Sequence, residues 1–213
     1  MSRLLCAILL TVSVLAADDA AFSAYRDGDH QAALRLYRER AANGDPLALY
    51  NYAMVLKRGE GSGDTTDWRP LLRRAAEAGL AQAAYALGVA YENGDGVGRS
   101  QPEATRWFRQ AALSGHVEAE LSLATQYFLG RGVTRDYREA ARWYRAAAEH
   151  GHAGAQYLLA SMLEHGDGVA RDLMEAMHWY SLAARQGDQA AALQAKRLAQ
   201  SMTVSPPNPA PCQ

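Results

Sequence analysis

The sequence contains two Gly-Asp-Gly turns that could hold a ligand, Gly94-Asp95-Gly96 and Gly166-Asp167-Gly168. A phosphate-binding loop needs a lysine followed by serine or threonine, and a calcium loop needs carboxylates at alternating positions. Neither pattern surrounds these turns. We therefore interpret their glycines as residues that permit tight backbone turns.

Histidine is the second residue type that could do chemistry, and four of the six histidines are candidates for a metal site: His116, His150, His152 and His165. His116 and His152 each follow a helix-ending glycine, which favours surface loops. A metal site needs converging ligands, and no cysteine or carboxylate cluster accompanies them in the sequence. We expect no metal and no other cofactor.

Covalent catalysis has little support in the sequence. There is no Gly-x-Ser-x-Gly elbow and no Cys/His pair, and Cys212 lies in a proline-rich segment. The sequence therefore predicts a protein that is not an enzyme.

The dominant pattern is a repeat of 36 residues. Trp107, Trp143 and Trp179 are spaced by this period, and so are Gly115, Gly151 and Gly187. Such self-similarity indicates units that bury their apolar faces by stacking on their neighbours. We place three regular units at residues 81–116, 117–152 and 153–188.

Each regular unit reads as two helices joined by a glycine loop. Small residues at 88, 124 and 160 on the first helices allow close helix packing. The second helices begin at predicted capping boxes, in which a cap side chain and a glutamate three residues later bond reciprocally. These pairs are Ser100 with Glu103, Asp136 with Glu139, and Asp172 with Glu175.

Other helices flank the regular units. Residues 18–45 are predicted to form a helical hairpin, and residues 46–80 a degenerate, looser repeat whose second helix begins after an Asp67 cap because of Pro70. Residues 189–202 are predicted to form a C-terminal capping helix with a polar side.

The two ends of the chain read differently from the repeats. Residues 1–17 combine Arg3 with an apolar run and small residues before Asp18, which predicts a cleaved signal peptide rather than a membrane span. Residues 203–213 are proline-rich and are predicted to form a disordered tail. We expect an exported protein, periplasmic or secreted, with no stable membrane insertion.

The distribution of charged residues excludes one class of binding partner. With residues 1–17 removed, 21 basic and 23 acidic residues remain, a formal charge of −2, and no long run of like charge occurs. Nucleic acid is therefore not an expected partner.

The order Leu-Gly, Tyr, Gly-x-Gly-Val, Glu-Ala, Trp-Phe or Trp-Tyr, Ala-Ala and Gly resembles the Sel-one-like repeat family, a relative of the tetratricopeptide repeats. The resemblance implies an all-α fold, a right-handed superhelical solenoid of paired antiparallel helices. It also implies that the protein acts as a binding scaffold, because such arrays mostly serve that role.

By similarity to tetratricopeptide arrays, the first helices line a concave, protein-binding groove. The residues expected to face it flank the packing positions and are unusually apolar and aromatic for a solvated face. They are Tyr50, Met54, Tyr85, Val89, Glu92, Leu121, Thr125, Phe128, Tyr157, Ser161 and Glu164. The alternative is that neighbouring helices bury part of this row.

The sequence thus predicts a scaffold that binds an extended peptide or a helix from another protein of the cell envelope, in assembly, secretion or regulation. A cell-wall or glycan binder, or a β-lactam-directed hydrolase, is the alternative. Some exported cysteine-rich members of the resembled family act on or bind β-lactams, but they carry a cysteine pair in each unit and this chain carries none. Self-association through the end helix is a third possibility.

Overall fold

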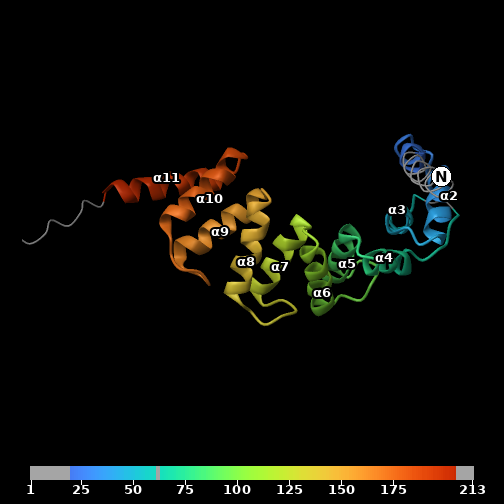
Figure 1. The fold of residues 1–213 in the computed structure, drawn as a ribbon, viewed down its shortest axis with the longest axis horizontal. Helices are drawn as coiled ribbons and strands as arrows, with labels where there is room; N and C mark the ends of the chain where they lie inside the picture. The colour runs from blue at the N-terminus through green and yellow to red at the C-terminus, as the bar shows by residue number, and fades with distance from the viewer. Residues whose placement is uncertain (1–19, 61–62, 205–213) are drawn as a thin grey trace, which may run out of the picture. The chain divides into compact units, whose positions relative to one another are not determined.

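The computed structural model describes residues 20–60 and 63–204, and all regular secondary structure in these ranges is helical (Figure 1). The all-α prediction is therefore confirmed. The predicted signal peptide, residues 205–213 and Cys212 lie outside the described residues. The chain divides into two compact units. The first ends at Gly98 and the second begins at Arg99.

The first unit contains a helical segment at residues 20–26 and four longer helices. Aspartates begin three of these four helices by accepting hydrogen bonds from backbone N–H groups: Asp29 before α2, Asp45 before α3 and Asp67 before α4. The Asp67 cap is as predicted. The four helices are α2 (His30–Ala42), α3 (Pro46–Lys57), α4 (Trp68–Glu77) and α5 (Ala81–Asn93).

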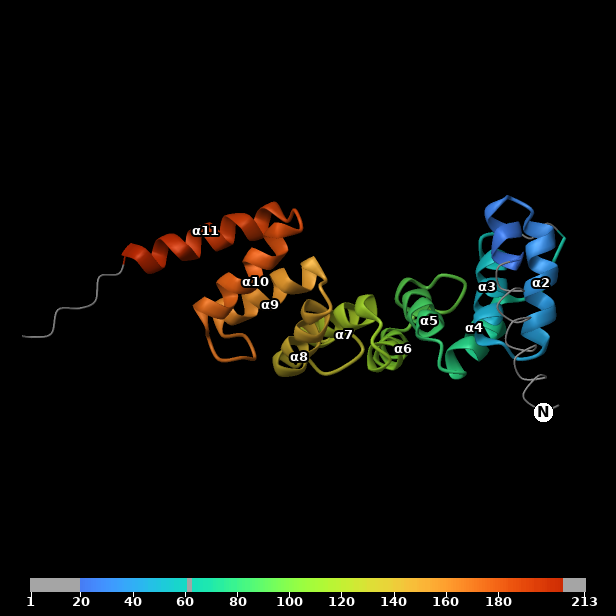
Figure 2. The same ribbon diagram turned by 45° about the horizontal axis from the view of Figure 1, so that its top comes forward.

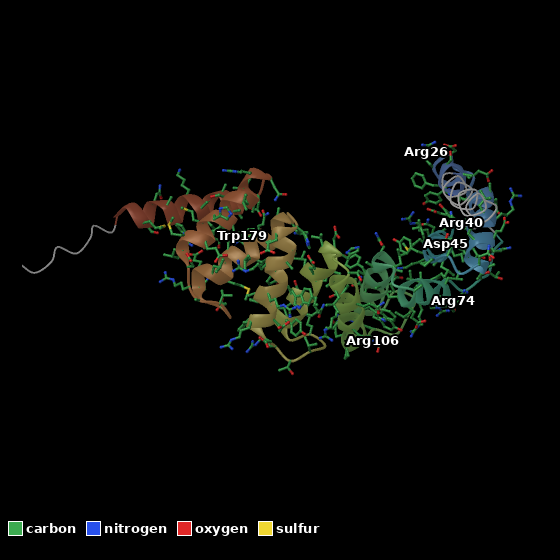
Figure 3. The ribbon with its side chains drawn as sticks, in the orientation of Figure 1. Arg26, Arg40, Asp45, Arg74, Arg106 and Trp179 are labelled. Atoms are coloured by element: carbon green, nitrogen blue, oxygen red, sulfur yellow. The ribbon has the colours of Figure 1, made fainter. Side chains whose placement is uncertain are left out.

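A sharp corner joins α2 to α3. Asn43 ends α2, Gly44 has a φ of +81°, and Asp45 starts the next helix. Asp45 also forms an ion pair with Arg40 of α2, and both residues are labelled in Figure 3. The left-handed conformation of Gly44 allows the chain to turn while the last carbonyl groups of α2 accept hydrogen bonds, and the ion pair connects the two helices directly.

The second unit consists of six helices, each packed against the next along the chain (Figure 2). The last helix continues through residues 203 and 204, which we had predicted to belong to the tail. The helices are α6 (Gln101–Leu113), α7 (Val117–Leu129), α8 (Tyr137–Glu149), α9 (Ala153–His165), α10 (Leu173–Arg185) and α11 (Gln189–Val204).

The interior of the helix pairs combines small, aliphatic and aromatic residues. Trp107, Trp143 and Trp179 on the second helices are all buried. Ala124 and Ala160 on the first helices are fully buried. Because alanine adds only a methyl group, the backbones of paired helices approach closely and the indole rings fill the remaining space.

The capping boxes are only half as predicted. Ser100, Asp136 and Asp172 accept hydrogen bonds from the backbone N–H of the third residue of each helix. The glutamates, however, accept bonds from other side chains, such as Arg106 for Glu103 at 3.0 Å. A charged guanidinium within one helical turn is a stronger donor than a backbone amide, so the carboxylate turns toward it.

The second glycine of each loop has a role beyond turning the backbone. Gly132 and Gly168 have φ values of +70° and +72°, and a Cβ at either would lie 2.3 Å from the backbone of the preceding second helix. That backbone belongs to Gln101 for Gly132 and to Tyr137 for Gly168. Glycine is therefore required both for conformation and for docking of one repeat on the next.

Arginine–tyrosine contacts also connect successive helices. Arg73 of α4 donates to the hydroxyl of Tyr91 of α5 at 2.8 Å, and Arg109 of α6 donates to Tyr127 of α7 at 2.9 Å. The two pairs are 36 residues apart, so the repeat specifies these contacts as well as the apolar core. No helix in the described part of the chain is long and apolar enough to span a bilayer.

Candidate binding surface on the first helices

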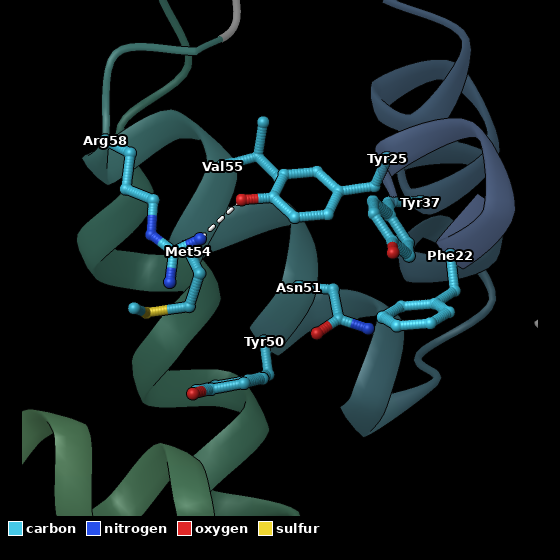
Figure 4. Close-up of a pocket in the computed structure, with 8 residues that line it drawn as sticks. All are labelled: Phe22, Tyr25, Tyr37, Tyr50, Asn51, Met54, Val55 and Arg58. Atoms are coloured by element: carbon cyan, nitrogen blue, oxygen red, sulfur yellow. Dashed lines mark hydrogen bonds between the residues drawn. The ribbon is translucent and has the colours of Figure 1, made fainter. Parts of the chain in front are cut away.

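A pocket of about 190 Å³ lies between the helical segment 20–26 and α3 (Figure 4). Four aromatic side chains contribute to it from three successive helices. The lining residues are Phe22, Tyr25, Tyr37, Tyr50, Asn51, Met54, Val55 and Arg58. Concave apolar surface with a few convergent polar groups is typical of a binding site.

The floor of the pocket is buried and the rim is accessible. Tyr37 and Val55 are each 3% exposed, whereas Phe22 is 58% exposed. Burial raises the pKa of the Tyr37 hydroxyl, and the nearby Tyr25 hydroxyl adds to the shift. Tyr37 is therefore neutral at physiological pH, and the floor carries no charge.

Polar groups lie along one side of the pocket. The Arg58 guanidinium donates to the hydroxyl of Tyr25, which in turn donates to Glu60 at 3.0 Å. Figure 4 shows the Asn51 side chain extending into the pocket toward Phe22. An occupant would thus meet aromatic rings below it and hydrogen-bond donors beside it.

Tyr50 and Met54 are the two predicted groove residues that line this pocket. Three further predicted residues of the first unit, Tyr85, Val89 and Glu92, are half-buried on α5. Sequence reasoning missed Phe22, Tyr25, Tyr37 and Arg58 as site residues. The signal that could have found the first two is the aromatic pair three residues apart in a segment with no repeat counterpart.

Except for Glu164, the predicted row in the second unit is half-buried, and each aromatic member packs against a ring of its own repeat. Phe128 packs on Tyr137 with 5.1 Å between ring centroids, and Tyr157 packs edge-on against Tyr180 at 5.3 Å. Thr125 lies 3.1 Å from the hydroxyl of Tyr144. Leu121 and Ser161 complete the half-buried set.

Glu164 is a correction to the predicted groove. It is only 8% exposed, accepts a hydrogen bond from Tyr180 at 3.1 Å and forms an ion pair with Arg197 of α11. Burial, and then the charge of Glu164, raise the pKa of the Tyr180 hydroxyl. Glu164 therefore serves the attachment of α11, a contact that repeat position alone does not reveal.

The histidines have structural partners. His150 contacts the buried carboxylate of Glu120 at 2.8 Å, and His116 contacts Glu118 at 3.2 Å. Within the described ranges, no three His, Cys, Asp or Glu side chains are grouped so that they could hold a metal ion.

Paired helices with small-residue interfaces, repeated at a fixed period, define a helical-repeat scaffold. The sequence profile of the Sel1 repeat matches residues 81–116, 117–152 and 153–188. These segments make up half of the chain, which therefore belongs to the Sel1 repeat family. Proteins built from this repeat generally act as scaffolds in protein interaction.

Solved structures of the same family confirm the predicted solenoid fold class. A Sel1 repeat protein from Oxalobacter formigenes has a TM-score of 0.80 and 28% identity, over 88% of this chain and 78% of that one. A protective antigen of uropathogenic Escherichia coli with an SLR fold has a TM-score of 0.69 and 36% identity, over 74% of this chain. The match covers 34% of the antigen, so this chain spans about a third of its length. No curated protein sequence matches the chain.

Proposed function

We propose that this protein is an exported scaffold that binds another protein non-covalently on its first-helix faces, in envelope assembly, secretion or regulation. The observation that carries the proposal is the aromatic pocket beside α3, which contains Tyr50 and Met54 of the predicted row. Aromatic anchors in a desolvated pocket typically supply most of the binding energy of a protein interface.

The shape of the surface favours an extended peptide or one face of a helix. The pocket accepts an apolar side chain, and the half-buried residues of α5, α7 and α9 offer further apolar contacts. Few of these groups are charged, so apolar burial is expected to dominate and binding is expected to depend weakly on salt. Export is inferred from residues 1–17 alone.

Affinity capture from an envelope extract tests the proposal. The bait is the chain from Asp18 onward, without the predicted signal peptide. It is compared with a pocket variant, Tyr50→Ala/Met54→Ala, and a row variant, Tyr85→Ala/Tyr157→Ala. The control is Leu113→Ala, which removes apolar surface from a side chain that is 70% exposed on the second helix α6. Circular dichroism checks that every variant remains helical.

A protein retained by the parent and by the control, but lost from the pocket variant, is the expected result. If all baits retain the same proteins, or none, the groove assignment is wrong. Sedimentation with isolated cell wall then tests the glycan-binding alternative, and turnover of a chromogenic β-lactam tests the hydrolase.

A further inference from the structure

We propose that the pocket of the first unit binds a proline-rich segment, and that its occupant is residues 205–211 of this chain, Ser-Pro-Pro-Asn-Pro-Ala-Pro. The proposal shares the pocket with the function above but requires no envelope partner. A direct peptide titration can therefore succeed or fail independently of the capture experiment.

The spacing of the prolines matches an aromatic pocket. A polyproline II helix has three residues per turn, so Pro206 and Pro209 lie on the same edge of such a helix. Proline rings on one edge pack between aromatic side chains, which here are Phe22, Tyr25 and Tyr50. Because proline already restricts the backbone, ordering the segment on binding costs little conformational entropy.

Hydrogen-bonding groups of the pocket and the segment are complementary. Prolines have no backbone N–H, and in a polyproline II helix the carbonyl groups make no internal hydrogen bonds. The segment therefore presents mainly acceptors. The pocket supplies donors beside its rings, namely the amide of Asn51 and the guanidinium of Arg58, which uses one of its N–H groups on Tyr25.

Residues 205–211 are distinguished from the other prolines of the chain. Four of the seven prolines lie in this segment. The remaining three, Pro46, Pro70 and Pro102, lie in the first turns of α3, α4 and α6, where they serve helix initiation. As polyproline II, seven residues span about 22 Å, enough for two turns across the pocket.

A peptide titration tests the proposal. A fluorescent peptide of residues 203–213, with serine in place of Cys212, is titrated with the protein carrying Pro206→Ala/Pro207→Ala/Pro209→Ala, so that its own segment does not compete. Fluorescence anisotropy should show saturable binding. Phe22→Ala or Asn51→Ala in the pocket should each weaken binding by about tenfold or more.

Two controls test whether binding depends on the pocket and on the prolines. Leu113→Ala, far along the sequence on α6, should leave the affinity unchanged, and a peptide with the three prolines replaced by alanine should bind at least about tenfold more weakly. Circular dichroism confirms folding of each variant. Absence of saturation at about 1 mM protein, or binding that ignores both Phe22 and the prolines, would overturn the proposal.

Sedimentation velocity then identifies which copy supplies the segment. If a second copy does, the parent self-associates as its concentration rises and the triple-proline variant does not. If the same molecule does, the parent stays monomeric but binds the peptide more weakly than the triple-proline variant. A monomeric parent that binds the peptide as tightly as the variant contradicts the proposal, because its own segment would then not compete.

Discussion

At the residue scale, Asp64 shows how one carboxylate organises a loop next to the binding surface. It accepts hydrogen bonds from the hydroxyl of Tyr52 at 2.8 Å and the backbone N–H of Thr66 at 3.0 Å, and it pairs with Arg38. Burial alone would raise the pKa of Asp64, but the bonds from Thr66, Tyr52 and Arg38 outweigh it and hold the pKa well below its ordinary value. Asp64 thus joins the degenerate loop to α2 and α3.

Asp64→Asn is expected to destabilise the protein by about 1–3 kcal/mol at pH 7, because a partly buried, charge-assisted network loses its anion. Because the pKa of Asp64 is lower in the folded state than in the unfolded state, its contribution to stability is fully present above the unfolded-state pKa of about 4. Below that pH the contribution declines as the folded-state pKa is approached. Urea unfolding of parent and variant should therefore show a constant difference from pH 7 to about 4 and a shrinking one below.

Tyr52→Phe is the matched control for the charge itself. It removes a hydroxyl that donates to Asp64, accepts from Arg38 and contacts Thr66, but it leaves the ion pair of Asp64 with Arg38. Its cost should be near 1 kcal/mol, smaller than that of Asp64→Asn. The assigned direction of the Asp64 pKa shift would be wrong if the free energies of unfolding of parent and Asp64→Asn differed by the same amount down to the lowest measurable pH.

At the element scale, the sequence predicted helix starts better than contacts between helices. The caps at Asp67, Ser100, Asp136 and Asp172 could be predicted because capping depends on residues within one turn. The close approach at Gly168 could not, because it depends on where the preceding second helix lies in space. A glycine that permits a turn and a glycine that permits contact look identical in sequence.

Gly168→Ala and Gly151→Ala separate these two roles. Both glycines have positive φ, +72° and +88°, but only Gly168 has backbone atoms of another helix within 2.3 Å of an added Cβ. We expect Gly151→Ala to cost about 1–2 kcal/mol from conformation alone. Gly168→Ala should cost about 1–3 kcal/mol more from overpacking. If urea unfolding shows the same loss of stability for both variants, the loop that contains Gly168 moves away from α8 without cost.

The attachment of α11 gives a second test at this scale. Arg197→Ala leaves the carboxylate of Glu164, which is 8% exposed, without its cation. Because the Arg197 side chain is 56% exposed, solvent screens the pair and the expected loss is about 1–2 kcal/mol. Amide exchange in α11 should accelerate in this variant. The neighbouring exposed residue supplies the control, Lys196→Ala, and an identical acceleration there would contradict the role of the pair.

At the scale of the whole molecule, periodicity predicted the architecture, but it pointed to only two of the residues that line the pocket. The tryptophan and glycine spacing was sufficient to identify the family because each of the three regular units repeats it. Tyr50 and Met54, which line the pocket, were predicted from their repeat positions, whereas Phe22 and Tyr25 belong to a segment outside the repeats. Glu164 was misassigned because α11 replaces the next regular helix pair at the end of the array.

The predicted groove residues are divided between the two compact units, and this leads to a prediction for affinity. Met54→Ala in the first unit and Leu121→Ala in the second each remove a half-buried apolar side chain. If one partner contacts both units, each change should weaken binding by about 5–30-fold, since burial of such a side chain contributes about 1–2 kcal/mol. The double variant should lose the product of the two factors, because the two side chains belong to different compact units.

Biolayer interferometry with the captured partner measures these affinities, with Leu113→Ala as the control. Multiplicative losses would place the partner across both units. An unchanged affinity for Leu121→Ala, combined with a loss for Met54→Ala, would confine the interface to the aromatic pocket of the first unit. The second unit would then serve stability rather than recognition, and its half-buried row would be ordinary helix packing of the kind that the contacts of Phe128 and Tyr157 already illustrate.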